Sequence, residues 1–190
     1  LEFRRVLFRS EAYADFAPET ALPLLEEFDH LLITRTLSKS YSLAGLRVGY
    51  AIGHPKVIKK LDMVREVYNL DRLAQAGAQA ALNDREHFQE CLGKIIEQRE
   101  WLSEQFHSIG WRTLPSGANF VFVRPETADK KFGPSVASSL FHHLATDKIL
   151  VRYFPKHPLT ESYLRISIGK QLEMVMLMNS VKQWTSKDQR

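Results

Sequence analysis

The sequence predicts an α/β fold, because short runs of β-branched and apolar residues alternate with longer segments that have helical periodicity. The strand-like runs cover residues 30–37, 46–53, 111–125, 147–154 and 162–169. Helical segments cover residues 55–67, 71–82, 84–109 and 134–145, and a last helix follows Gly169. This alternation favours a sheet with at least partly parallel pairing.

The first half of the chain has clear local signals for its elements. Residues 11–17 look like the end of a strand entering a loop, and Pro18 and Pro23 bracket a short helix. The run 30–37 has strand length and ends at a polar cluster that extends to Ser42. Pro55 suits the first turn of the helix that follows the second strand.

The segment 84–109 predicts one long amphipathic helix. Its apolar stripe skips the turn at Arg99, and Gly110 suits the C-cap. The stripe consists of Phe88, Leu92, Ile95, Leu102, Phe106 and Ile109. After Gly110 the residue pattern changes to that of short strands. We therefore expect a larger domain over 11–109 and a smaller α/β domain over 110–190.

Residues 1–10 lack the pattern that a strand or helix needs, because charges interrupt the apolar positions. They resemble a vector- or adaptor-derived junction, and the alternative is an ordinary basic strand. On the first interpretation the chain is a truncated fragment, and these residues are excluded from the predicted fold.

The composition is that of an ordinary globular protein, with 44% hydrophobic and 25% charged residues among 190. The formal net charge of +4 comes from dispersed Lys and Arg, so we expect no nucleic-acid partner. No apolar run approaches the roughly 20 residues of a membrane span, and no metal site is expected. A single cysteine, Cys91, is more typical of packing than of catalysis and fits a reducing, cytoplasmic setting.

The polar loop after residues 30–37 contains the most informative chemistry. It places hydroxyls at Thr36, Ser38, Ser40 and Ser42 around Lys39, and Arg47 opens the next strand. Hydroxyls and a guanidinium form a suitable phosphate site. An amine buried near other cations has a lowered pKa and can condense with an aldehyde. The alternative is a polar loop with an exposed lysine.

The spacing T-x-S-K-x-x-x-L-x-G-L-R-x-G closely resembles the cofactor-lysine motif of class I/II aminotransferases, and especially their histidinol-phosphate branch. Further segments resemble this family in the same order, so the likeness extends from Glu11 to Trp184. They are Glu11-Ala12-Tyr13, Tyr68-Asn69, Leu73-Ala74-Gln75, residues 115–120, Val151-Arg152 and residues 164–169.

The resemblance implies a partial fold-type I architecture, with a remnant of the large mixed or parallel-sheet domain followed by the small carboxy-terminal domain. It implies pyridoxal 5'-phosphate as cofactor, bound covalently by Lys39, which would then act as general acid and base. Thr36, Ser38 and Arg47 would bind its phosphate, and Tyr13 its ring oxygen.

Two arginines in the second half are implied to bind the substrate. Arg165 would bind its anionic end and Arg152 is a second candidate, while ordinary strand arginines are the alternative for both. Asn69 and Tyr41 are either site neighbours or polar packing residues.

The implied reaction is amino transfer from histidinol phosphate to 2-oxoglutarate in histidine biosynthesis. Threonine-phosphate decarboxylases and aromatic aminotransferases share these motifs and remain alternatives, as does an inert fragment. The resemblance also implies a homodimer for the full-length protein. One departure is Ser10, where the family has an aspartate that pairs with the ring nitrogen, so we expect the chain alone to be catalytically poor.

Overall fold

The computed structural model describes residues 6–187. The chain divides between Leu92 and Gly93 into two compact units. The boundary between these compact units lies inside the long helix α3 (Arg85–Ser108). The predicted domain boundary at residue 110 coincides with the end of this helix and stays a prediction. The correspondence of the two units to the large and small domains of the family stays a prediction.

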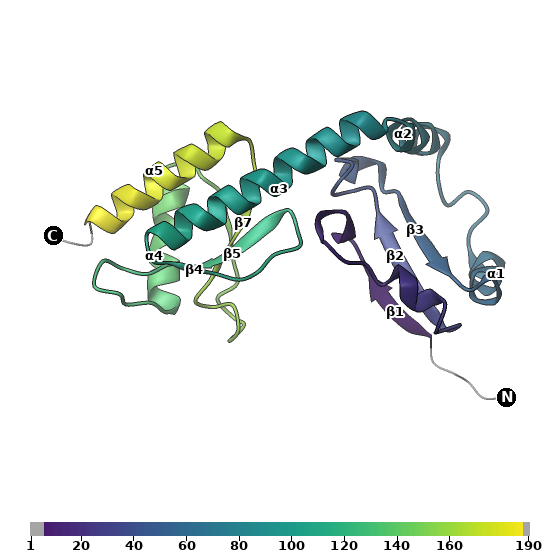
Figure 1. Ribbon diagram of the computed structural model, residues 1–190, viewed down its shortest axis with the longest axis horizontal. Helices are drawn as coiled ribbons and strands as arrows, with labels where there is room; N and C mark the ends of the chain where they lie inside the picture. Colours follow the sequence, from purple (N-terminus) through teal and green to yellow (C-terminus); the bar gives the residue numbers. More distant parts are fainter. Residues whose placement is uncertain (1–5, 188–190) are drawn as a thin grey trace. The chain divides into compact units, whose positions relative to one another are not determined.

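The first unit contains a three-stranded sheet in the order β1-β2-β3 (Figure 1). Strand β1 (Leu7–Ser10) pairs in parallel with β2 (Leu31–Thr36), and β2 pairs antiparallel with β3 (Gly49–Gly53). Three single 3-10 turns connect these strands at Ala14–Phe16, Leu22–Leu25 and Ala44–Leu46. In place of the short helix expected near Pro23, the chain forms only the turn Leu22–Leu25, which contains this proline.

The expectation that residues 1–10 form no regular element is wrong for Leu7–Ser10, which form β1. This strand has exposed side chains throughout, so it has no apolar alternation for a sequence pattern to show. Backbone pairing with β2 stabilises it instead. The strand does not test the origin of these residues, and the junction remains a prediction.

Two helices complete the first unit before α3 begins. Helix α1 (Pro55–Val64) begins with the predicted proline at its first position, and α2 (Arg72–Asn83) is capped by Asp71, which accepts two backbone N–H bonds. A small apolar cluster joins α2 to the loop after β2. Its buried members are Leu37, Val48, Ala74 and Ala78.

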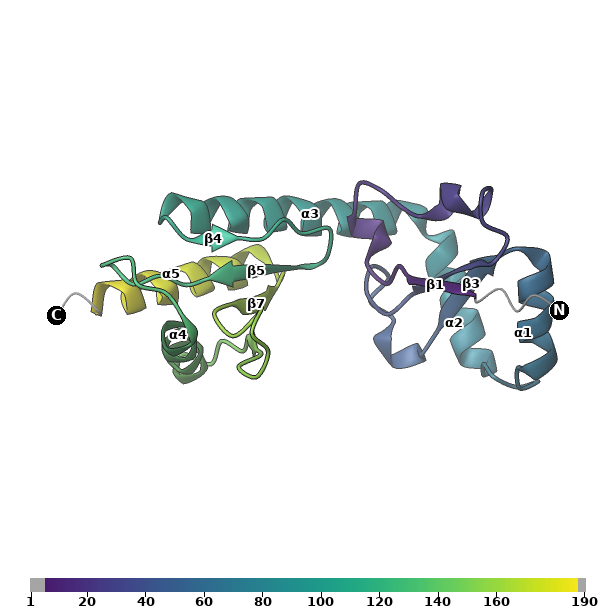
Figure 2. The same cartoon turned by 90° about the horizontal axis from the view of Figure 1, so that it is seen from below.

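The second unit contains a four-stranded antiparallel sheet in the order β4-β5-β7-β6. Its strands are β4 (Arg112–Thr113), β5 (Phe120–Arg124), β6 (Arg152–Tyr153) and β7 (Leu164–Ser167), and Figure 2 shows β4, β5 and β7 in succession. Parallel pairing is thus confined to β1 and β2 among the described strands.

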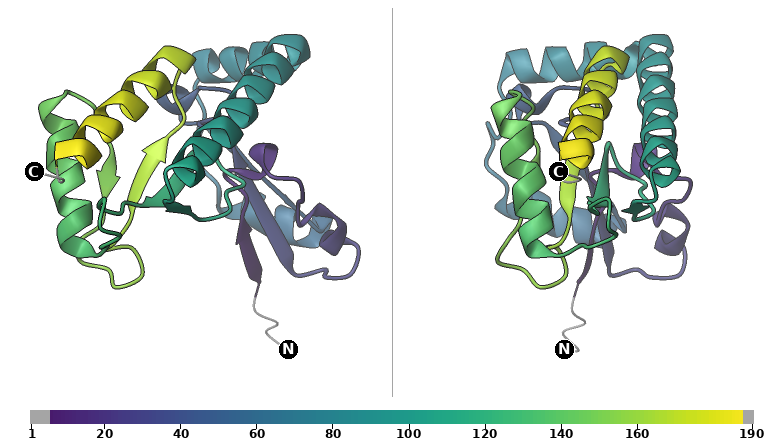
Figure 3. Two further views of the ribbon diagram at one scale, coloured as in Figure 1. Left: turned by 60° about the vertical axis from the view of Figure 1, so that its left-hand side comes forward. Right: turned by 90° about the vertical axis from the view of Figure 1, so that its left-hand side faces the viewer.

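Three helices share one core with this sheet: α3, α4 (Pro134–Thr146) and α5 (Gln171–Lys187), which are drawn in Figure 3. Alternation along the strands buries one face and leaves the other face for polar groups. On β7, Leu164 and Ile166 are buried in the core, while Arg165 between them points away from it. On α5, the buried side chains include Met174, Leu177, Val181 and Trp184, which belong to this core.

The predicted α/β class is therefore confirmed. The described part of the chain contains no helix long and apolar enough to cross a membrane.

Candidate functional site

The loop that bears Lys39 follows β2 directly and is closed by backbone hydrogen bonds. The amide of Ser42 donates to the carbonyl of Lys39 at 3.1 Å, and the amide of Leu43 donates to the carbonyl of Leu37 at 3.0 Å. Leu37 is 1% exposed and anchors the start of the loop in the apolar cluster. Lys39 therefore occupies a defined turn.

Thr36 and Ser38 lie together at the base of this loop. The Thr36 hydroxyl donates to Ser38 Oγ at 2.9 Å, lies 3.3 Å from the carbonyl of Val48, and accepts the Ser38 amide at 3.1 Å. Thr36 thus holds the loop against the start of β3. A hydroxyl that accepts the Thr36 proton keeps its own, so Ser38 has a donor to offer.

Lys39 lies beside Tyr13, with its Nζ 5.7 Å from the centre of the tyrosine ring. The structure therefore brings together two of the residues that the sequence analysis selected. Lys39 itself is exposed, so the expected burial of its amine near other cations is wrong for this chain. The loop packs through its flanking residues Leu37 and Ser40, which leaves the lysine at the surface.

Arg47 does not open a strand, which corrects another expectation. It follows the turn Ala44–Leu46 in the left-handed conformation, with φ of 56°, and β3 begins only at Gly49. A residue other than glycine in this conformation costs about 1–2 kcal/mol. The turn is stabilised by a bond of 2.9 Å from Arg47 Nη1 to the carbonyl of Ala44, and the other guanidinium donors have no acceptor among the residues that the structure describes.

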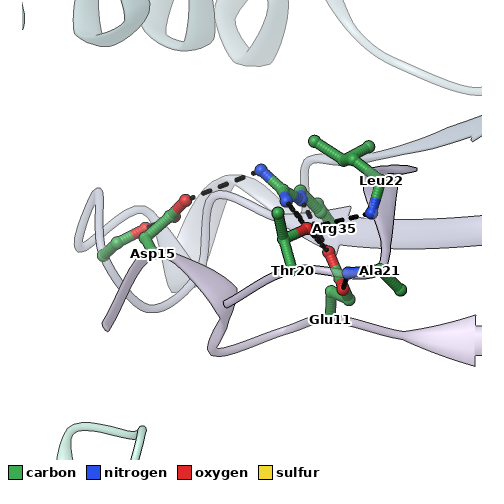
Figure 4. Close-up of polar contacts among 7 residues, drawn as sticks. Glu11, Asp15, Thr20, Ala21, Leu22 and Arg35 are labelled. Atoms are coloured by element: carbon green, nitrogen blue, oxygen red, sulfur yellow. Dashed lines mark hydrogen bonds and ion pairs between the residues drawn. The ribbon is translucent and has the colours of Figure 1, made fainter. Parts of the chain in front are cut away.

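A network that the sequence analysis did not find joins the segment around Tyr13 to β2 (Figure 4). Glu11 is 7% exposed, and its Oε2 accepts bonds from Arg35 Nε at 3.2 Å and Nη2 at 2.9 Å. The same carboxylate accepts bonds from the Thr20 hydroxyl and from the Ala21 amide. The other side of the Arg35 guanidinium faces Asp15, whose Oδ1 lies 3.9 Å from Nη1.

The network ends at the Lys39 loop, because the Ser40 hydroxyl donates a hydrogen bond to Asp15 Oδ2. The sequence analysis grouped Ser40 with the hydroxyls of a phosphate site, but its hydroxyl is bound to this carboxylate instead. Parallel pairing of β1 and β2 would have placed Glu11 opposite Arg35, but β1 had been excluded from the predicted fold.

The network also sets the charge states of its central pair. Burial raises the pKa of Glu11, but hydrogen bonds from Ala21, Thr20 and Arg35 together with the charge of Arg35 hold it below its usual value. Burial lowers the pKa of Arg35, but hydrogen bonds to Glu11 and Tyr50 together with the charges of these two residues hold it above its usual value. Both groups are therefore charged at neutral pH.

The two uncertain neighbours are now placed. Tyr41 stacks on Phe88 with ring centres 4.3 Å apart, which is aromatic packing between the loop and α3. Burial first, and then the negative charge of Asp15, raise the pKa of Tyr41. Asn69 accepts a bond of 3.3 Å from Arg65 in an exposed position. The Tyr41 contact favours the packing interpretation, whereas the exposed contact of Asn69 favours neither interpretation.

The two arginines predicted to bind an anion lie opposite each other on neighbouring strands of the second unit. Arg165 of β7 pairs in register with Arg152 of β6 on one side and with Phe122 of β5 on the other. The guanidinium of Arg165 lies 5.1 Å from the ring of Phe120 and 5.7 Å from that of Phe154. Its Nε is buried and has no hydrogen-bond acceptor within the described residues.

This arrangement favours an anion. Like charges directly opposite on adjacent strands repel each other, and a buried guanidinium N–H without an acceptor is unfavourable. A carboxylate or phosphate group would relieve both costs.

The family model of aminotransferase class I and II matches residues 2–181. The chain belongs to this family. It is 46% identical over 178 residues to the histidinol-phosphate aminotransferase of Citrifermentans bemidjiense, a match that covers 94% of this chain and 49% of that protein. The chain thus spans about half the length of the curated relatives it matches.

Solved structures show the same relationship. The histidinol-phosphate aminotransferase of Sinorhizobium meliloti, in complex with pyridoxal-5'-phosphate, superposes with a TM-score of 0.82 at 29% identity, covering 96% of this chain and 49% of that one. The L-threonine-O-3-phosphate decarboxylase of Porphyromonas gingivalis superposes with a TM-score of 0.74 at 19% identity, covering 95% and 55%. The second match shows the fold alone. The predicted family resemblance and the partial fold are confirmed.

Proposed function

We propose that this chain is the lysine-bearing part of a pyridoxal-phosphate-dependent aminotransferase that transfers the amino group of histidinol phosphate to 2-oxoglutarate. The observation on which this depends is the position of Lys39, in a closed loop beside the ring of Tyr13. Membership in the family and high identity to histidinol-phosphate aminotransferases support the cofactor and the substrate.

The residues present fit most of this cofactor. Lys39 supplies an accessible amine for its aldehyde, and the Ser38 hydroxyl and free donors of Arg47 suit its phosphate. Thr36 would contribute indirectly through Ser38, because its own hydroxyl is already bonded within the loop. The Tyr13 phenol would donate to the ring oxygen.

Neither Ser10 nor Glu11 is a suitable partner for the ring nitrogen. Ser10 has no carboxylate, and the adjacent Glu11 cannot replace one because its oxygens are bound by Arg35, Thr20 and Ala21. An unprotonated ring nitrogen makes the ring a poorer electron sink. We therefore propose that the 190-residue chain binds the cofactor but turns over slowly, if at all.

The chemistry of the chain's own groups follows from their positions. Pyridoxal phosphate, when bound, supplies a conjugated ring that delocalises the electron pair left at the substrate Cα. Lys39 would hold this aldehyde carbon until the substrate amine takes its place, and the freed Lys39 amine would then move the proton from the substrate Cα to the former aldehyde carbon.

Arg165 orients the substrate from its anionic end. A bidentate guanidinium fixes a carboxylate or phosphate in one orientation. Arg152, directly opposite in register, adds a second positive charge to the same anion. A substrate with a phosphate group makes use of both charges.

Cofactor binding is tested by incubation with pyridoxal phosphate, reduction with borohydride and peptide mapping. We expect the label on Lys39, no label at that peptide in Lys39→Ala, and unchanged labelling at Lys39 in Lys59→Ala, which removes an exposed lysine of α1. A labelled chain in which Lys39 is no more modified than other lysines would support an inert fragment.

The substrate is tested in a full-length protein that contains this sequence. Histidinol phosphate, aromatic amino acids and phosphothreonine are offered separately with 2-oxoglutarate. We expect turnover of histidinol phosphate and its loss in Lys39→Ala. Preference for an aromatic amino acid, or carbon dioxide release from phosphothreonine, would instead assign the corresponding branch of the family.

We also propose a cytoplasmic setting and a homodimer for the full-length protein. The single cysteine agrees with a reducing compartment. The molar mass of the full-length protein in solution tests the dimer.

A further inference from the structure

We propose that Ser40, Asp15 and Arg35 are positioning residues that hold the Lys39 loop against the segment bearing Tyr13. This inference rests on the proposed role of Lys39 and adds residues to it. It assigns a role to a largely buried charged network.

The network connects both partners of the Lys39–Tyr13 pair. Asp15 is two residues after Tyr13, and Ser40 directly follows Lys39. The hydrogen bond from the Ser40 hydroxyl to Asp15 therefore joins the two segments next to the residues whose separation matters.

Arg35 fixes the position of Asp15 from the sheet. Its guanidinium lies between the carboxylates of Asp15 and Glu11, at 3.9 Å and 2.9 Å (Figure 4). Glu11 in turn is held to the sheet by its amide, which donates to the carbonyl of Thr34 on β2 at 2.8 Å. Asp15 is thus attached to β2 through one ion pair and to the loop through one hydroxyl.

The residues around the contact between Ser40 and Asp15 are largely buried, which shields this contact from water. Ser40 is 6% exposed and Glu11 7% exposed, whereas Lys39 between the packed residues of its loop is exposed. A buried hydroxyl with a carboxylate acceptor makes a stronger bond than a hydroxyl in water. The lysine can therefore remain accessible to an aldehyde while its backbone is fixed by its neighbour.

The first test measures amide hydrogen exchange in the unliganded chain. Ser40→Ala removes the donor, and we expect exchange of the Ser42 and Leu43 amides, which close the loop, to accelerate about tenfold or more. The amide of Ile149, bonded to Leu144 at 2.8 Å in the other unit, should keep its rate. Unchanged loop exchange would overturn the proposal, and so would global unfolding, because the bond would then serve the fold and not the loop.

A second variant tests the same bond from its acceptor. Asp15→Asn keeps the size of the side chain but removes the charge, and Asp29→Asn is the matched control because Asp29 is exposed just before β2. We expect faster loop exchange in the first variant only. In the double variant Asp15→Asn with Ser40→Ala, the loop amides should exchange no faster than in Ser40→Ala alone, since both substitutions act on the same interaction. Additive effects would contradict this linkage.

The third measurement follows Lys39 itself. With pyridoxal phosphate and borohydride, Ser40→Ala should reduce the preference for labelling Lys39 over other lysines by severalfold, and Asp29→Asn should not. Unaltered preference would show that the loop does not position the lysine. If the wild-type chain takes no label at Lys39, the proposed function fails, while the exchange experiment still decides whether the network holds the loop.

Discussion

Arg35 binds Glu11 through two of its donors, since Nε and Nη2 both contact Oε2, at 3.2 and 2.9 Å. Glu11 follows β1 and Arg35 lies in β2, so the pair joins the first segment of the chain to the centre of its sheet. Because burial makes a broken pair costly, loss of either charge should weaken this junction.

Acid should destabilise the first unit through Glu11. The folded-state pKa of Glu11 is lowered, so its contribution to the free energy of unfolding is complete above its unfolded pKa of about 4.3 and is lost as the pH falls through the lower folded value. The pKa of Arg35 is raised, so its contribution is complete at every acidic pH. Urea unfolding from pH 6 to pH 3 should show this loss.

Glu11→Gln isolates the effect, because the amide cannot titrate. We expect this variant to be less stable at pH 6 and its stability to fall less steeply in acid than that of the wild type. Glu27→Gln, at an exposed position, is the control and should keep the wild-type slope. Equal slopes for Glu11→Gln and the wild type would assign the acid sensitivity to other carboxylates.

Most helices and the strands β2 and β3 could be predicted because their signals are local. Pro55 begins α1, and Gly110 with φ of 84° follows the end of α3, as the residue types indicate. Strand β1 could not be predicted, because its side chains are exposed and its stability comes from backbone pairing with a distant segment.

The site was predicted in part for the same reason. Lys39, Thr36 and Ser38 are close in sequence, so one motif contains them. The ion pair of Glu11 with Arg35 and the bond of Ser40 with Asp15 span 24 and 25 positions, and no spacing rule connects such residues. Arg99 was skipped as a polar interruption of the helical stripe, yet it is 9% exposed.

Gly49→Ala should destabilise the pairing of β2 with β3. A Cβ at Gly49 would lie 2.9 Å from the backbone carbonyl oxygen of Arg35, and backbone cannot move aside cheaply. We expect a loss of about 1–3 kcal/mol in the free energy of unfolding. Gly45→Ala is the control, because nothing lies within 4 Å of the added atom. Equal midpoints in urea for the two variants would contradict the strand register.

Arg99→Met should weaken the second unit. Arg99 Nη1 donates to the carbonyl of Ala118 at 3.0 Å, in a buried position between α3 and the loop before β5. Losing this bond while the carbonyl stays buried costs about 1–3 kcal/mol. Arg85→Met, at an exposed position on the same helix, should change stability by no more than about 0.5 kcal/mol. Thermal unfolding of both variants measures the difference.

Arg152→Gln should make the second unit more stable when no anion is present. Arg152 lies directly opposite Arg165, and removing one of two facing like charges should contribute about 0.2–1 kcal/mol at low ionic strength. The gain should disappear near 1 M salt, where the screening length is about 3 Å. Chemical unfolding at low and high sodium chloride concentrations measures this gain.

Arg112→Gln is the matched control for that experiment. Arg112 faces Arg124 across β4 and β5 in the same way, but Arg124 is neutralised by Glu126, whose Oε1 lies 2.7 Å from its Nη2. We therefore expect Arg112→Gln to leave stability nearly unchanged.

Inorganic phosphate then distinguishes an anion-binding site from mere repulsion between the two facing arginines. At equal ionic strength, phosphate should stabilise the wild-type chain more than the Arg152→Gln variant. In the wild type it would bind the folded state between two facing guanidinium groups, whereas the variant offers only one. Equal stabilisation of both proteins would mean that Arg152 takes no part in anion binding. In that case Arg165, with its buried Nε and its aromatic neighbours, would bind the anion alone.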